Sequence, residues 1–194
     1  MSRLVVLKRH PKRTLTGLTA ALAAAAVAVG SGADFTAASA NPSNTFSSGT
    51  LSTSNSNDGA AILTASGLKP GGAATTGTVD IKNTGSLDGV FTLTRGIPAD
   101  TGSTSALSGK LNVTVGDCGL WTGSTPPSCS SPTTIYSGTL SQMGTSGHAI
   151  SSLGTFSGGD KHRYQFSVSL DPTADNNYQG GTSTVEFDWS ATQS

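Results

Sequence analysis

Residues 164–170 read YQFSVSL, and this short stretch decides the fold class. Its apolar side chains occupy every second position: Tyr164, Phe166, Val168 and Leu170. Because successive side chains of a β-strand point to opposite faces, this spacing places all four on one face and the polar residues on the other. A strand with one apolar face is typical of an antiparallel sheet that packs on one side and meets water on the other.

The same alternation recurs in TVDIK (78–82), GVFTLT (89–94), KLNVTV (110–115) and VEFDWSA (185–191). The residues that it predicts to face inward are Val79, Ile81, Phe91, Leu93, Leu111, Val113, Val115, Val185, Phe187, Trp189 and Ala191. Gly, Pro, Asn and Asp separate these short runs, and no helical pattern follows the N-terminal region. We therefore expect an all-β protein with about eight to ten strands. The predicted architecture is a single antiparallel jelly-roll-like β-sandwich over residues 46–194.

Two local predictions refine this picture. The first strand of the sandwich is expected at residues 45–51, which include Phe46 and Leu51. Residues 83–89, NTGSLDG, consist mainly of turn formers and are expected to form a hairpin loop between two paired strands.

The N-terminus has the pattern of a helical signal peptide, predicted at residues 1–33. Basic residues lie between positions 3 and 13, and an apolar, alanine-rich run follows at 15–29. Small residues at 31–33 and 38–40 offer two cleavage points, one after Ala33 and the alternative after Ala40. An uncleaved N-terminal anchor is the competing interpretation.

Charge and cysteine content narrow the function of the remaining chain. From Asn41 onward there are six Lys and Arg against ten Asp and Glu, a net charge of −4. This balance argues against a nucleic-acid binder and against adsorption to anionic lipid. Cys118 and Cys129 are an even, closely spaced pair, which in an exported protein predicts a disulfide that closes a loop at 117–132. A zinc site is disfavoured because two thiols without nearby histidine supply half of the ligands.

No catalytic constellation emerges from the sequence, and we expect neither an enzyme nor a cofactor. His148 and His162 both lie beside turn residues and are interpreted as solvated. The oxygen-bearing side chains of 171–177, DPTADNN, could bind calcium, but the same residue types form ordinary turns.

Three stretches together resemble the TasA/camelysin (CalY-like) family of exported bacterial proteins of biofilm matrix and surface fibres. They are NTFSSGTL (44–51), LKPGGAATTGTVDIKNTGSLDGVFTL (68–93) and NNYQGGTSTVEFDWSATQ (176–193), whereas residues 97–160 depart from the family. The resemblance implies a jelly-roll sandwich that is secreted to the matrix or cell surface and associates with itself into filaments. It further implies that residues 34–45 form a flexible arm that completes the sheet of the next subunit.

Phe35 and Phe46 are the candidate anchors of that donated segment, and Phe35 survives only if cleavage follows Ala33. Expected partners are other copies of the chain and other matrix or cell-wall components, with no nucleic acid and no stable membrane insertion after cleavage. Two alternatives stay open. One is a camelysin-like metalloprotease, disfavoured because no zinc motif is present. The other is a monomeric carbohydrate-binding or adhesive module, for which Trp121 is the best stacking residue and Trp189 is expected to be buried.

Overall fold

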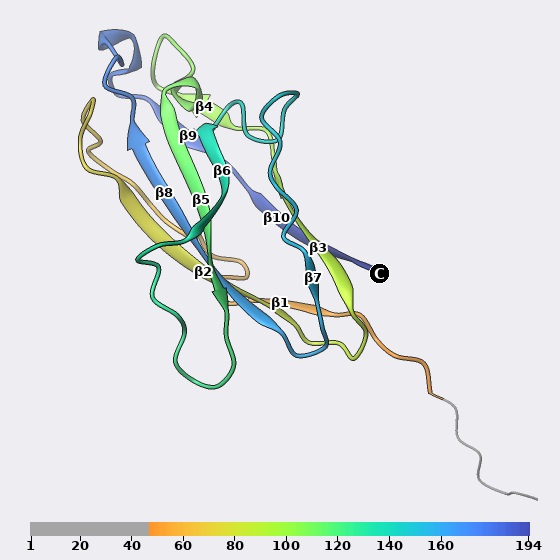
Figure 1. Ribbon diagram of the computed structural model, residues 1–194. Coiled ribbons are helices and arrows are strands. Elements are labelled where there is room, and N and C mark those ends of the chain that lie inside the picture. The colour runs from red at the N-terminus through yellow and green to blue at the C-terminus, as the bar shows by residue number, and fades with distance from the viewer. Residues whose placement is uncertain (1–46) are drawn as a thin grey trace, which may run out of the picture. The chain divides into compact units, whose positions relative to one another are not determined.

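The computed structural model describes residues 47–194, which form one compact unit. This unit contains ten strands and two short 3-10 helices (Figure 1). The strands are β1 (Thr53–Asn55), β2 (Thr75–Asn83), β3 (Gly89–Arg95), β4 (Ala99–Thr101), β5 (Leu111–Leu120), β6 (Thr133–Thr139), β7 (Thr155–Phe156), β8 (Lys161–Leu170), β9 (Thr182–Thr184) and β10 (Phe187–Gln193). The helices are η1 (Leu107–Gly109) and η2 (Asn176–Tyr178). The signal peptide, the arm at 34–45, Phe35 and Phe46 all lie outside the described residues.

The strands form two main antiparallel sheets and a small third one. The five-stranded sheet has the order β1-β2-β8-β5-β6, and the three-stranded sheet has the order β10-β3-β7. Strands β4 and β9 pair with each other alone. The prediction of an all-β, antiparallel, sandwich-like fold is therefore confirmed.

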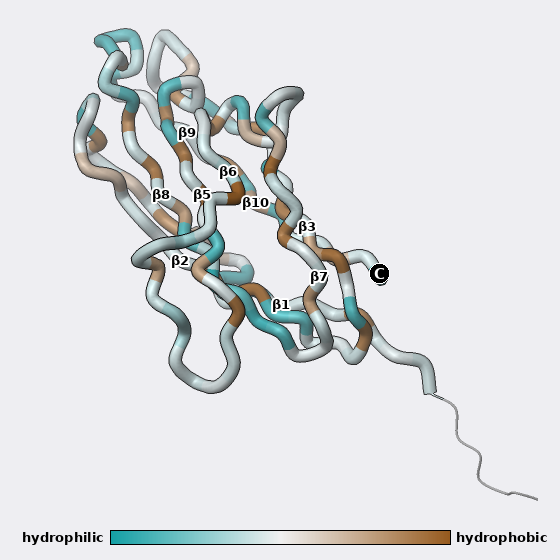
Figure 2. The backbone as a smooth tube through the Cα atoms, in the orientation of Figure 1, coloured by the Kyte–Doolittle hydropathy of each residue, from teal (hydrophilic) through white to brown (hydrophobic). Residues whose placement is uncertain are grey.

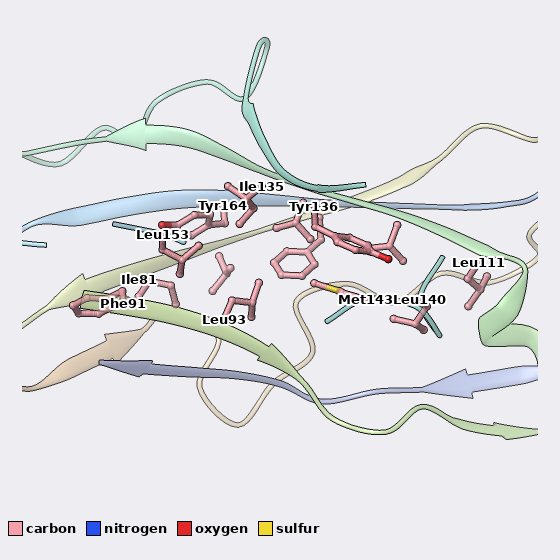
Figure 3. Close-up of a cluster of buried hydrophobic side chains, with 14 of the residues drawn as sticks. Ile81, Phe91, Leu93, Leu111, Ile135, Tyr136, Leu140, Met143, Leu153 and Tyr164 are labelled. Carbon is pink, nitrogen blue, oxygen red and sulfur yellow. The ribbon is translucent and has the colours of Figure 1, made fainter. Parts of the chain in front are cut away.

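The core lies between the two main sheets and contains the residues that alternation placed there (Figure 3). Val79, Val115, Phe91, Tyr164 and Phe166 are at most 1% exposed. In Figure 2, hydrophobic and pale segments alternate along β5 and β8, as expected when one face of each strand is buried. The inner side of β10 differs, because its apolar residues are only partly buried: Phe187, Trp189 and Ala191.

Aromatic side chains connect the two sheets. Within the three-stranded sheet the rings of Phe91 and Phe156 stack with centroids 4.2 Å apart, and His162 of the five-stranded sheet stacks on the other side of Phe156 at 4.3 Å. Farther along β8, Tyr164 packs against Trp189 at 5.0 Å. Aromatic pairs of this kind contribute about 0.5–1.5 kcal/mol beyond the area that they bury. In each aromatic pair that joins the two sheets, one ring belongs to β8.

The prediction that residues 83–89 form a hairpin loop is wrong. Strand β2 belongs to the five-stranded sheet and β3 to the three-stranded sheet, so the connection crosses from one layer to the other. Asn83, which is fully buried, holds this crossing in place. Its Nδ2 donates to the carbonyl oxygens of Leu87 (2.8 Å) and Phe156 (3.0 Å), and its Oδ1 accepts from the Gly85 N–H (3.0 Å).

The predicted first strand at 45–51 is also wrong where the structure describes it, because β1 begins at Thr53. Residues 50–52 instead bond to the crossing: Thr50 O accepts from the N–H groups of Ser86 (2.8 Å) and Leu87 (3.0 Å). A side chain at Gly85 would collide with this segment, since its Cβ would lie 2.8 Å from the Ser52 nitrogen. The chain therefore passes close over Gly85 before it enters the sheet.

The predicted disulfide is confirmed between Cys118 and Cys129. The loop that it closes is shorter than the predicted 117–132, because β5 continues to Leu120 and pairs with β8 as far as His162. A register shift between Asp117 and Gly119 accommodates this extension.

Candidate binding groove

A groove of about 730 Å³ opens between the edge strands of the two main sheets. One wall is β1 with the turn that follows it, and the other is β10 with the two residues before it. The large apolar side chains in its lining are Ile62, Ile81, Val185, Phe187 and Trp189. Because Ile81 is a core residue, the groove reaches to the edge of the hydrophobic core.

Within residues 47–194, both walls have backbone that is not paired with another strand. Strand β1 pairs only with β2, and β10 pairs only with β3. The outer side of each strand therefore presents N–H and C=O groups to whatever enters the groove. An edge of this kind is a ready template for an added strand.

The opposite side of the sandwich is covered by the chain itself. Residues 140–154 run between the edge strands β6 and β7, where the Ser151 N–H donates to Ile135 O (3.0 Å). Met143 and Leu153 from this segment are buried in the core. The two sides of the sandwich thus differ, and the side between β1 and β10 carries the groove.

Acidic residues contribute to the lining of the groove. Asp58, Glu186 and Asp188 belong to its lining, and none of the six lysines and arginines between residues 47 and 194 does. Trp189 adds a second polar feature, because its indole Nε1 is buried without a hydrogen-bond partner among the described residues. The groove combines an apolar floor with free backbone edges.

His162 is not the solvated turn residue that the sequence suggested. It lies on β8, shares the inner face with Tyr164, and its side chain is only 18% exposed. Its Nδ1 lies 2.9 Å from Asp117 Oδ2, and Asp117 Oδ1 accepts from the Gly119 N–H at 2.7 Å. The imidazole is held between a carboxylate and the Phe156 ring, which is a structural environment. His148 does lie in a turn, where its carbonyl accepts from the Gly144 N–H.

Trp121, the residue considered for sugar stacking, is half-buried and partly covered. The Lys161 ammonium lies 3.3 Å from the indole centroid, and the Arg163 guanidinium carbon lies 5.9 Å away. The backbone N–H of Trp121 also donates to the Lys161 carbonyl oxygen at 2.9 Å. A cation over the ring leaves at most one face of the indole for a ligand.

The calcium hypothesis finds no assembled ligand set. Asp171 accepts from the N–H and hydroxyl of Thr173, and Asp175 caps η2 through the Asn177 N–H. Both carboxylates therefore have the turn and cap roles that are ordinary for Asp. Over the whole described range, no three His, Cys, Asp or Glu side chains are grouped as metal ligands.

The structure does not place the two candidate anchors, since Phe35 and Phe46 precede the described residues. The groove was not predicted, although the sequence contains one signal for it. The alternation of Val185, Phe187 and Trp189 marks an inward-facing strand, and an edge position would leave such a strand partly exposed. Which strands form the edges depends on pairing between distant residues.

Among residues 47–194 there is no helix long and apolar enough to cross a membrane. No protein-family model matches the chain, and no curated protein matches it.

Proposed function

We propose that this chain is a secreted structural protein of the cell surface or biofilm matrix, not an enzyme. It assembles head-to-tail into fibres by donation of the N-terminal segment, and its sandwich is of the jelly-roll type. The observation that carries the proposal is the groove between β1 and β10, with a partly exposed apolar floor and unpaired backbone on both walls. Its partners are other copies of the chain and neighbouring matrix or cell-wall components, with no nucleic acid or membrane required.

The groove has the properties that an extended peptide needs. A peptide that pairs with β10 would satisfy the free backbone groups and would point alternate side chains at Val185, Phe187 and Trp189. Phe35 is the largest apolar side chain in the arm at 34–45. Complete burial of a phenylalanine contributes about 1.5–3 kcal/mol, which is enough to fix the register of a donated strand.

The arm is also long enough. The arm has twelve residues, which span about 40 Å when extended. Strand β10, which the arm would cover, has only seven residues. The arm can therefore cover the edge and still leave residues to connect the subunits. Because the donor and the acceptor are different surfaces, the contact does not close on itself and propagates into a filament.

The test uses the secreted, processed protein and a variant that lacks residues 34–45. Electron microscopy and sedimentation are expected to show fibres for the intact protein and monomers for the variant. Equal polymerisation of the two proteins would refute strand donation.

A second pair of variants tests the groove from the acceptor side. Ala61 is exposed and lines the groove, so Ala61→Trp fills the space with an indole. Ala73, which is also exposed but lies outside the lining, serves as the matched control in Ala73→Trp. We expect the first substitution to suppress fibre formation and the second to leave it unchanged. Fibres of normal yield from Ala61→Trp would place the acceptor site elsewhere.

A further inference from the structure

The first described residues enter the domain at the end of the sandwich where β10 finishes. The last residue of β10, Gln193, is the ladder partner of Gly89, the first residue of β3. The entering segment lies against the same place, because a Cβ added to Gly89 would be 2.6 Å from the Cδ1 of Leu51. We call this the exit end of the domain, since the arm continues from it. Figure 1 shows it at the end of β3 that lies away from β4.

At the other end of β10 the pairing of the strands is interrupted by a bulge. The ladder between β3 and β10 reaches Gly96, whose N–H donates to Glu186 O at 2.9 Å. The ladder between β4 and β9 resumes with the pair of Ala99 and Thr184. Two residues on the β3 side therefore face one residue on the β10 side, which is the count that defines a β-bulge.

This bulge turns a large apolar side chain into solvent. Ile97 lies in it and is 93% exposed. Leu120, at 53%, is the other large hydrophobic residue that is exposed among residues 47–194. Ile97 faces Val185, which lines the groove, so it stands where the groove meets the start of β10. We call this the entry end. Bulges commonly serve to aim a side chain, which gives this exposure a purpose that a scattered surface residue lacks.

A strand that adds to β10 can run in either direction, and the direction decides where the body of the donor lies. If the strand is parallel to β10, the exit end of the donor meets the exit end of the acceptor. Each subunit can then take the arm of the other, and the contact closes as a twofold dimer. If the strand is antiparallel, the exit end of the donor meets the entry end of the acceptor. The arm of the acceptor then stays free for a further subunit, and the chain of contacts remains open.

Backbone geometry favours the same choice. Both main sheets are antiparallel throughout, so an antiparallel strand would continue the pattern beyond β10. Antiparallel pairs are also slightly more stable per residue than parallel pairs.

We propose that the arm of one copy adds antiparallel to β10 of a second copy, and that Ile97 of the acceptor packs against the exit end of the donor. This inference rests on the proposed strand donation, to which it adds a direction and a second contact. The exit end offers a suitable apolar surface, because Leu51 and Leu87 are only half-buried there.

The direction is tested by thiol cross-linking in fibres of the secreted, processed protein. A donor variant, Asn44→Cys, is assembled together with an acceptor variant, either Glu186→Cys or Thr192→Cys. Both acceptor positions are exposed and lie near opposite ends of β10, about 20 Å apart. With a reagent whose reach is well below this separation, we expect position 44 to be joined to position 186 and not to position 192. Peptide mapping by mass spectrometry identifies the cross-links.

The contact of Ile97 is tested by two substitutions at the same site. Ile97→Ser removes the apolar side chain, and Ile97→Leu keeps one of equal size. Neither should change the thermal midpoint of the monomer, because the side chain is exposed there. We expect Ile97→Ser to raise the critical concentration for fibre growth about tenfold, and Ile97→Leu to stay within about twofold of the unmodified protein.

The outcomes separate this inference from the proposed function. A cross-link at position 192 in place of 186 would overturn the direction and leave strand donation standing. Fibres without a cross-link at either position would show that the arm does not pair with β10, so both proposals would fail. Equal critical concentrations for Ile97→Ser and the unmodified protein would overturn the contact of Ile97 alone.

Discussion

Replacing Asn83 by alanine removes the side chain that connects the two sheets where β2 passes into β3. Its amide makes three hydrogen bonds, two to the carbonyl oxygens of Leu87 and Phe156 and one from the Gly85 N–H. Alanine leaves all three backbone groups without that partner. A buried polar group without a partner costs about 1–3 kcal/mol, and the Leu87 and Gly85 groups lie near enough to solvent to recover part of it.

We therefore expect Asn83→Ala to lower the free energy of unfolding by about 3 kcal/mol. For a domain of this size each kcal/mol lowers Tm by about 2–4 °C, so the predicted decrease is about 6–12 °C. Urea and thermal denaturation, followed by circular dichroism, measure both quantities.

Two further variants sharpen the interpretation. Asn176→Ala, at an exposed asparagine of η2 whose side chain makes no hydrogen bond within residues 47–194, is the matched control and should change stability by less than about 0.5 kcal/mol. Asn83→Asp keeps one acceptor but places a carboxylate against two carbonyl oxygens. It should destabilise at least as much at pH 7, and less in acid, where the neutral carboxyl can donate. A loss below about 1 kcal/mol for Asn83→Ala would refute the assigned role.

Three other predictions concern features outside the groove. The double variant Cys118→Ser, Cys129→Ser opens a loop whose ends are 11 residues apart and should lose about 3 kcal/mol, and an unchanged urea midpoint would contradict this. Burial alone would raise the pKa of Asp100, but the hydrogen bonds from the Ser108 hydroxyl and N–H outweigh it and lower the pKa. Ser108→Ala should therefore lower the free energy of unfolding by about 1 kcal/mol at pH 7. This difference from the wild type should shrink below about pH 4, because Asp100 is then protonated. A difference that grows in acid would contradict the lowered pKa of Asp100. Arg163 and Asp80 form a bidentate ion pair. A double-mutant cycle should give a coupling energy of about 0.5–1 kcal/mol that falls with added salt. A coupling energy that does not change with salt would contradict an electrostatic origin.

The inner faces of the sheets could be predicted because the signal is local. Period-two alternation depends only on the geometry of a single strand, so Tyr164, Phe166 and Phe91 were placed correctly without knowledge of their neighbours. The same rule, extended two residues toward the N-terminus, would have put His162 on the inner face with Tyr164. Gly158 and Gly159, which lie shortly before His162, favour a turn instead.

Pairing between strands could not be predicted in the same way. Residues 83–89 contain ordinary turn formers, and both β2 and β3 have one apolar face whether they join one sheet or two. What separates the two cases is the set of hydrogen bonds made by Asn83 with residues far along the chain, such as Phe156. The groove was missed for a related reason, because an edge strand is defined by a partner that it lacks.

The crossing between β2 and β3 also sets the order in which the domain can form. Strand β3 ends at Arg95, and the partner that runs along its full length, β10, begins only at Phe187. Strand β2 likewise pairs along most of its length with β8, which starts only at Lys161. Folds dominated by such distant pairings form slowly, because long loops must close before any contact is gained. A growing chain therefore cannot complete the five-stranded sheet before β8, or the three-stranded sheet before β10, has left the ribosome.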